Sequence, residues 1–266
     1  MANSIAPPNA RELTPSVQRP FRIGLIVPSS NITMETEIPA MLRSRQTIAP
    51  DLFTFHSSRM RMRKVTKEEL VAMDRQADRC AEELSDAEVD VIGYACLVAI
   101  MSMGPGYHRE AEERLGSIAR RNHAPTELVS SAGALIEGLR ALRAQRVAMI
   151  TPYMKPLTRL VAEYIEGEGI RVNDALSLEI ADNIAVGERD PRALIDIFPK
   201  LDSREADVIV LSACVQMPSL EAIPLIEASC GKPVISAAVC TVYAMLKRLG
   251  LPARVPNAGA LLSGDF

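Results

Sequence analysis

Short apolar runs alternate with amphipathic stretches along most of the chain. The runs have strand length and are rich in Val, Ile and Leu, which is typical of parallel strands buried on both faces. We expect such strands over residues 22–27, 52–57, 89–95, 126–129, 146–152, 170–178, 207–213 and 232–236. The stretches between them predict helices that open at Thr33 and Pro218 or span residues 66–84, 107–121, 131–142, 154–167, 191–201 and 237–249. Strands that alternate with helices indicate parallel sheets joined by right-handed crossovers, with helices on both faces.

The pattern occurs twice, and one motif marks the repeat most clearly. An acidic residue, an apolar run and an Ala-Cys pair make up both residues 90–96 and residues 207–214. Residues 22–28 match residues 146–152, since each segment has a basic residue, an apolar run and a proline. We therefore predict an α/β protein of two pseudo-symmetric, Rossmann-like (flavodoxin-like) halves, each built on a parallel sheet.

The restart of the pattern sets the expected domain boundaries. The first half is expected over residues 21–130 and the second over residues 131–235, with residues 236–266 completing the first half. Residues 1–20 are rich in Pro, Asn, Ser and Ala and are predicted to form a flexible tail. This tail lacks the apolar core of a secretory signal.

Polar and thiol side chains gather where the predicted strands end. Residues 28–31, Cys96, residues 152–153 and Cys214 all fall at such ends. Ligands of parallel sheets collect at the carboxyl ends of the strands. Two facing halves would place these segments around one cleft, so we predict the active site there.

The chain has five cysteines, an odd number with irregular spacing and without a CxxC pair. This pattern favours reduced thiols in the cytoplasm over a disulfide framework or a structural zinc site. A lone cysteine in an apolar segment is usually a small buried hydrophobe, and we assign that role to Cys80, Cys230 and Cys240. Cys96 and Cys214 occupy equivalent strand ends, which favours a chemical role. No Lys or Arg adjoins them, so N–H groups at the start of the next helix would have to stabilise a thiolate and lower its pKa.

Several neutral polar residues near these strand ends have two interpretations. Residues 29–31 can cap the following helix or offer neutral donors to a carboxylate. Tyr153 either packs or donates a hydrogen bond from its hydroxyl. Asn183 lies in a predicted loop, where it either holds a turn or contacts a ligand.

Nothing in the sequence indicates a cofactor or a metal. His56, His108 and His123 show neither metal-ligand spacing nor a nucleophile–base pattern, and only His108 is expected near the Cys96 end. The glycines of residues 104–106 lack the spacing of a dinucleotide-binding loop, and there is no Walker motif.

Charge and composition exclude several classes of partner. The 30 Lys and Arg residues against 33 Asp and Glu residues leave a net charge of -3, which gives no electrostatic reason to bind nucleic acid or an anionic membrane. Aromatic residues make up only 4% of the chain, with no Trp, so platforms for stacking bases are not expected. No apolar run reaches membrane-spanning length. We expect a cytoplasmic protein that acts on a small molecule.

Three motifs resemble those of the maleate cis-trans isomerases, which belong to the aspartate/glutamate racemase superfamily and are relatives of the arylmalonate decarboxylases. The motifs are PSSNITMETE (28–37), YACLVAIMSMGPGYH (94–108) and ACVQMPS (213–219). The resemblance runs from about residue 21 to the C-terminus. It implies a cofactor-free site between two α/β halves, a small dicarboxylate substrate (maleate), a homodimer and a place in nicotinate degradation.

The resemblance also implies a role for each matching residue. Cys96 would be the nucleophile and Cys214 the second catalytic cysteine. The implied substrate-binding residues are Asn31, Ser29, Leu97, Val98, Tyr153, Asn183 and Val215. Addition of a thiolate to the olefin, rotation about the resulting single bond and elimination would yield fumarate. Without the resemblance, the near-symmetry of the motifs does not say which cysteine attacks.

Two kinds of alternative remain open at this stage. One is a decarboxylase or a two-base racemase of the same superfamily, because two facing cysteines also suit proton removal on one face and delivery on the other. The other is a non-catalytic protein that clamps small acids between its two halves.

Overall fold

The computed structural model describes residues 19–62, 67–122 and 126–266. Most of the expected N-terminal tail, the first residue of the helix expected from residue 66, and His123 lie outside these ranges.

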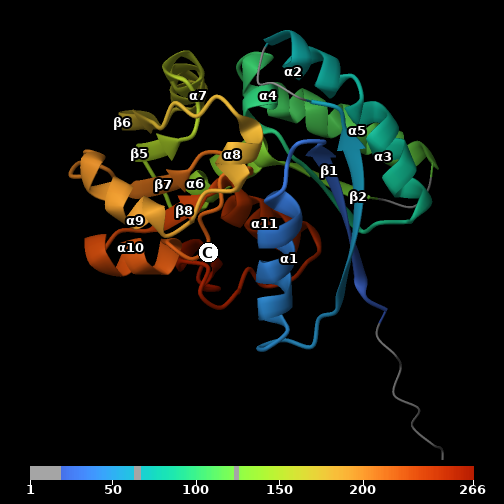
Figure 1. The fold of residues 1–266 in the computed structure, drawn as a ribbon. Coiled ribbons are helices and arrows are strands. Elements are labelled where there is room, and N and C mark those ends of the chain that lie inside the picture. Colours follow the sequence, from blue (N-terminus) through green and yellow to red (C-terminus); the bar gives the residue numbers. More distant parts are fainter. Residues whose placement is uncertain (1–18, 63–66, 123–125) are drawn as a thin grey trace, which may run out of the picture.

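Eight strands form two parallel sheets with the same strand order (Figure 1). The first sheet has the order β2-β1-β3-β4 and consists of β1 (Phe21–Pro28), β2 (Phe53–Met60), β3 (Val91–Tyr94) and β4 (Glu127–Ser130). The second has the order β6-β5-β7-β8 and consists of β5 (Arg146–Thr151), β6 (Arg171–Ser177), β7 (Val208–Ser212) and β8 (Val234–Ser236). The predicted α/β class with two parallel-sheet halves is confirmed.

Helices follow nearly every strand and cover the sheets (Figure 1). Those of the first half and the crossover are α1 (Met34–Arg45), α2 (Lys67–Asp74), α3 (Ala77–Asp86), α4 (Leu97–Ser102), α5 (Tyr107–Asn122) and α6 (Ser131–Ala141). Those of the remaining chain are α7 (Lys155–Gly167), α8 (Asn183–Gly187), α9 (Ala193–Ile197), α10 (Ile223–Cys230) and α11 (Ala237–Arg248), with 3₁₀ turns at Phe198–Lys200 and Ala260–Leu262.

Two of the predicted helices are interrupted in the structure. The single helix expected to residue 84 is two helices, α2 and α3, which separate after Asp74. The Asp74 carboxylate accepts hydrogen bonds from Tyr94 (2.7 Å) and Tyr107 (2.8 Å), so the end of α2 is held by the rest of the fold, which the apolar periodicity does not report. The helix expected over residues 191–201 ends at Ile197 and continues as a 3₁₀ turn, because Pro199 has no N–H to continue α-helical bonding.

The repeated motifs occupy equivalent positions and make equivalent hydrogen bonds. Asp90 donates its N–H to the Arg22 carbonyl (2.8 Å), and its carboxylate accepts the Arg22 N–H (2.7 Å). Asp207 does the same with Arg146, at 2.8 and 2.9 Å. The acidic residue of each motif therefore fastens the cysteine-bearing strand to its neighbour, as expected of a duplicated unit.

The C-terminal helix α11 contacts both halves. It follows β8 of the second sheet and packs against β3 and β4 of the first, and against α1 and α6. A Cβ added to Gly138 of α6 would lie 2.7 Å from the Cys240 sulfur of α11, so these two helices approach closely. This packing agrees with the idea that the C-terminal residues complete the first half, although the domain boundaries stay a prediction. Across the described ranges, no helix is both long and apolar enough to cross a membrane.

We expect Gly138→Ala to lower the free energy of unfolding by about 1–2 kcal/mol, because the new methyl group overpacks the contact between α6 and α11. Urea denaturation measures the change. Gly167→Ala is the matched control, since nothing lies within 4 Å of its added Cβ, and it should be neutral or slightly stabilising. In a Cys240→Ala background the cost of Gly138→Ala should shrink; an undiminished cost there would contradict the proposed contact.

Candidate active site

Cys96 lies at a sharp turn between β3 and α4. Its backbone has φ 79° and ψ 70°, in the left-handed region that non-glycine residues rarely adopt. The Ala95 N–H is still bound to the Ile26 carbonyl of β1 (2.8 Å), and α4 begins at Leu97, so the change from strand to helix falls on Cys96 alone. The Ala99 N–H donates to the Cys96 carbonyl at 3.1 Å and closes the first turn of the helix beside the thiol. This strained turn places the thiol at the carboxyl end of the sheet, and such strain is common at functional sites.

Cys214 lies at the equivalent end of β7, but a different structure follows it. The helix expected to open near Pro218 begins only at Ile223, so a turn supplies the N–H groups around this thiol. The Gln216 N–H donates to the Cys214 sulfur at 3.4 Å. The Ser212 hydroxyl holds the turn by bonding the Cys214 carbonyl at 2.8 Å.

The tertiary structure brings Tyr153 together with both cysteines. The three side chains are buried, with exposed fractions of 8% for Cys96, 6% for Cys214 and 7% for Tyr153. Ionisation of either thiol would oppose ionisation of the Tyr153 hydroxyl, and the hydroxyl is a hydrogen-bond partner of Cys214. The structure thus brings these three predicted site residues together, and their catalytic roles stay a prediction.

Burial dominates the ionisation of all three groups. It raises the pKa of Cys96 from 9.0 to about 12, opposed in part by the Ala99 N–H and reinforced by the nearby Cys214. Burial likewise raises the pKa of Cys214, although hydrogen bonds from Tyr153 and from the Gln216 and Met217 N–H groups oppose it. Backbone N–H groups lower the pKa of both thiols, as expected, but they do not offset the loss of water, and the pKa of each thiol is raised. The site at rest therefore contains neutral thiols.

Asn31 is both a helix cap and a free donor. Its side-chain oxygen accepts the N–H groups of Thr33 (3.0 Å) and Met34 (2.9 Å) at the start of α1. Its amino group has no hydrogen-bond partner within the described ranges and remains able to donate. Ser29 differs, because its hydroxyl is bound to both the N–H and the carbonyl of Met62 (3.0 and 3.1 Å). Ser29 thus ties the loop to the end of β2 in this structure.

Asn183 comes from the other half of the molecule and reaches the same loop. It was expected in a loop, but it is the first residue of α8, which Asp182 caps through the Ala185 N–H (2.8 Å). Its side-chain amino group donates to the Ser30 hydroxyl at 2.8 Å. Asn31 and Asn183 therefore flank one loop although 152 positions separate them in the sequence.

The remaining predicted site residues lie at the site through their backbone N–H groups. Leu97, Val98 and Val215 directly follow the two cysteines, and their side chains are buried. Leu97 and Val98 open α4, where the first N–H groups of a helix have no partner within the helix. They offer neutral donors beside Cys96.

Gln216 is a residue that the sequence reasoning did not single out. Its side-chain amino group donates to the carbonyls of Ser30 (3.0 Å) and Asn183 (2.7 Å), and its side-chain oxygen accepts the Ile32 N–H (2.9 Å). The sequence signal that could have identified Gln216 is a polar residue in the middle of the largely apolar ACVQMPS segment.

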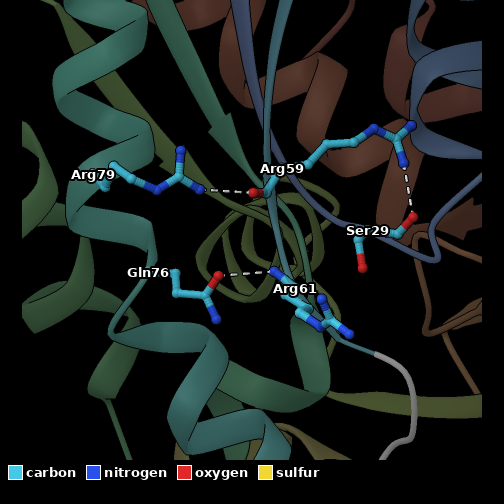
Figure 2. Close-up of a pocket in the computed structure, with 5 residues that line it drawn as sticks. All are labelled: Ser29, Arg59, Arg61, Gln76 and Arg79. Carbon is cyan, nitrogen blue, oxygen red and sulfur yellow. Dashed lines mark hydrogen bonds between the residues drawn. The ribbon is translucent and has the colours of Figure 1, made fainter.

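A basic hollow of about 600 Å³ lies beside this loop at the end of β2 (Figure 2). Its lining residues are Ser29, Arg59, Arg61, Gln76 and Arg79. The guanidinium of Arg59 donates to the Ser29 carbonyl (3.0 Å), while that of Arg79 donates to the Arg59 carbonyl (2.9 Å). These groups point apart in Figure 2 and are also paired with Glu35 and Glu83, so they do not converge on one anion.

The histidine expected near Cys96 is engaged elsewhere. His108 is buried, and its Nδ1 lies 2.5 Å from the Tyr164 hydroxyl of α7. Within the described ranges no three His, Cys, Asp or Glu side chains are grouped so that they could hold a metal ion.

Comparison with known proteins agrees with the geometry of the site. A family model described as arylmalonate decarboxylase matches residues 23–262. The maleate isomerase of Pseudomonas putida KT2440 is 60% identical over 246 residues, which cover 92% of this chain and 98% of that protein. The crystal structure of the maleate isomerase Iso from Pseudomonas putida S16 superposes with a TM-score of 0.92 at 62% identity, covering 93% of this chain and 100% of that one.

A third relative carries a covalent intermediate. It is a cysteine-to-serine mutant of the Nocardia farcinica maleate cis-trans isomerase with a covalently bound succinylcysteine. It superposes with a TM-score of 0.88 at 47% identity, covering 92% of this chain and 99% of that one. Identity of this extent over nearly the whole chain shows that the protein belongs to the maleate isomerase family, which shares its fold with arylmalonate decarboxylase.

Proposed function

We propose that this protein converts maleate to fumarate without a cofactor, using Cys96 as nucleophile and Cys214 as proton-transfer group. The observation that carries the proposal is the pair of buried thiols at equivalent strand ends with Tyr153 beside them. The family supports the substrate, since maleate isomerases about 60% identical to this chain cover nearly all of it.

The first step joins the Cys96 sulfur to one olefinic carbon. The π electrons of the C=C bond move to the neighbouring carbon and its carboxylate as an enediolate. Because both thiols are neutral at rest, the Cys96 proton passes by way of the Cys214 sulfur to that neighbouring carbon. The product is a succinyl thioether, which matches the succinylcysteine held by the Nocardia relative.

Rotation and elimination complete the reaction. The former double bond is now single and turns by half a revolution. Cys214 then takes the proton back from carbon and returns a proton to the Cys96 sulfur, which leaves as the C=C bond re-forms in the trans geometry. Atoms and electrons balance without an external reductant or base.

Neutral donors would hold the two carboxylates of the substrate. Charge grows on one carboxylate as sulfur attacks, so donors fixed in advance at that position stabilise the transition state. The free amino group of Asn31, the Tyr153 hydroxyl, the Asn183 side chain and the N–H groups after each cysteine are assigned to this role. Ser29 would act through the loop it ties down.

The same proposal includes the setting in which the protein works. We assign it to the cytoplasm, as a homodimer, in nicotinate degradation. The family resemblance supports all three assignments, and the five free cysteines favour a reducing compartment. Light scattering during size-exclusion chromatography tests the dimer.

The alternatives differ from the proposal in their products. A decarboxylase would release carbon dioxide from an arylmalonate, and a racemase would invert aspartate or glutamate. A proton NMR time course with each acid and no added cofactor distinguishes them. A binding protein would convert none of these acids, and iodoacetamide would leave its ligand binding intact.

We expect Cys96→Ala and Cys214→Ser each to reduce kcat/KM for maleate by a factor on the order of 10³ or more, because each removes a group that reacts. Fumarate formation is followed by NMR, and circular dichroism checks the fold. Cys230→Ser is the matched control, since this half-buried thiol at the end of α10 is outside the site, and it should retain activity. Near-normal activity in either active-site variant would exclude the role given to that cysteine.

The raised pKa of Cys96 predicts its reactivity in the free protein. The thiolate fraction should rise about tenfold per pH unit between about pH 7 and pH 10, with no plateau, because the pKa of about 12 lies above this range. Iodoacetamide labelling of the Cys96 peptide, quantified by mass spectrometry, measures the rate at each pH. Glutathione labelled in parallel should level off near its own lower pKa. A plateau at Cys96 below about pH 9 would show a preformed thiolate and contradict the neutral resting state.

A further inference from the structure

Gln216 connects more parts of the proposed site than any predicted site residue does. It is 3% exposed and lies two residues after Cys214. Three hydrogen bonds from its carboxamide cross to other segments: two to the residue 30–32 loop of the first half and one to Asn183 of the second. One side chain therefore spans the Cys214 turn and both asparagine-bearing segments.

The backbone of Gln216 takes part as well. Its carbonyl accepts the Thr33 hydroxyl at 2.6 Å, next to the α1 cap. Its N–H donates to the Cys214 sulfur at 3.4 Å. A shift of this residue would therefore change the environment of the thiol and the position of the loop at once.

A second contact between the halves fixes the other end of the turn. The buried carboxylate of Glu37 in α1 accepts the N–H groups of Ser219 (2.6 Å) and Leu220 (2.7 Å). The segment from Cys214 to Leu220 is thus held at both ends by α1 and the loop before it. Of the residues that make these contacts between the halves, Gln216 also donates a hydrogen bond to the Asn183 carbonyl.

We propose that Gln216 is a positioning residue, which holds the Cys214 turn, the Asn31 loop and the start of α8 in the one arrangement that lets both asparagines and Cys214 act on the same dicarboxylate. The proposal rests on the proposed function. It adds a residue to that site and does not alter the chemistry assigned to the two cysteines.

The contacts require glutamine at this position. Its nitrogen donates two hydrogen bonds to two carbonyls while its oxygen accepts a third. A glutamate has the same shape, but a carboxylate would face two carbonyl oxygens and bury a charge. An asparagine keeps the amide and is one methylene too short to span the loops.

Gly187 shows how tightly the amide is enclosed. A Cβ at this last position of α8 would lie 2.7 Å from the Gln216 nitrogen and 2.5 Å from Ile32 Cγ1. The backbone of α8 therefore passes close to the carboxamide. Gly187→Ala therefore displaces the same amide without changing Gln216 itself.

The experiment compares Gln216→Asn and Gln216→Glu with the wild type, and uses Gln46→Glu as the matched control. Gln46 is an exposed residue after α1, so the same chemical change there should have no effect. We expect kcat/KM for maleate to fall about 100-fold in Gln216→Asn, as for a displacement of reacting groups by about 1 Å. Gln216→Glu should lose more, because one oxygen of its buried carboxylate would face the carbonyls of Ser30 and Asn183 in place of the donor they now have.

A second measurement needs no substrate, and it distinguishes a displaced Cys214 turn from a general loss of structure. Iodoacetamide labelling of the Cys214 peptide across pH should show a higher pKa in both Gln216 variants, since the Gln216 N–H that favours the thiolate is displaced. Cys96 and Tyr153, the titratable neighbours of Cys214, are unchanged in these variants, and Gln216→Asn adds no charge, so the shift in that variant reports the displaced N–H alone. The dependence of Cys96 labelling on pH should match that of the wild type. General unfolding would expose Cys96 and change this dependence.

The outcomes are distinct. A Gln216→Asn protein with kcat/KM within about threefold of wild type and an unshifted Cys214 profile would overturn the proposal. If Gln216→Glu does not fold, the test rests on Gln216→Asn and Gly187→Ala. Both of these variants should raise the pKa of Cys214. A wild-type protein that leaves maleate unchanged would refute the proposed function, while the labelling profiles would still test the role of Gln216.

Discussion

The loss of water around two thiols governs how this site works. Cys96 and Cys214 are buried, and the backbone N–H groups and the Tyr153 phenol near them do not offset the loss of solvent, so burial favours the neutral form of both thiols. A pair of thiolates there would repel each other and a dianionic substrate. Neutral thiols avoid that repulsion, which agrees with the proposed transfer of a proton between sulfur and carbon. The polar groups near the thiols are amides and hydroxyls, which are also neutral and add no further charge to the site.

The scaffold is nearly symmetric, whereas the two thiols are not equivalent. Both sheets have the same strand order, and both cysteine-bearing strands are fastened by an aspartate to a neighbouring strand. Cys96 sits in a left-handed backbone conformation directly before a helix, while Cys214 precedes a turn held by Ser212. Tyr153 is a hydrogen-bond partner of Cys214 and opposes the rise in its thiol pKa. These local differences agree with the unequal roles proposed for the two thiols.

Polar contacts, and not only apolar packing, set how the halves meet at the site. Glu37 and Gln216 reach across the junction, and each bonds groups of the opposite half. Buried polar groups that are fully bonded specify one arrangement, because any other leaves donors or acceptors unpaired. This specificity suits an enzyme that grips two carboxylates from two sides.

The sequence by itself determined the strand pattern, the duplication and the equivalence of Cys96 and Cys214, because alternating apolar runs and repeated motifs depend only on local order. The motifs also identified the family. The tertiary structure alone decided the break after Asp74, the helical position of Asn183 and the contacts of Gln216, since each depends on partners distant in sequence. It also decided that burial outweighs the N–H groups in setting the pKa of the two thiols. Adjacent residues show which N–H groups are near a sulfur, but only the packed fold shows how much water is removed from it.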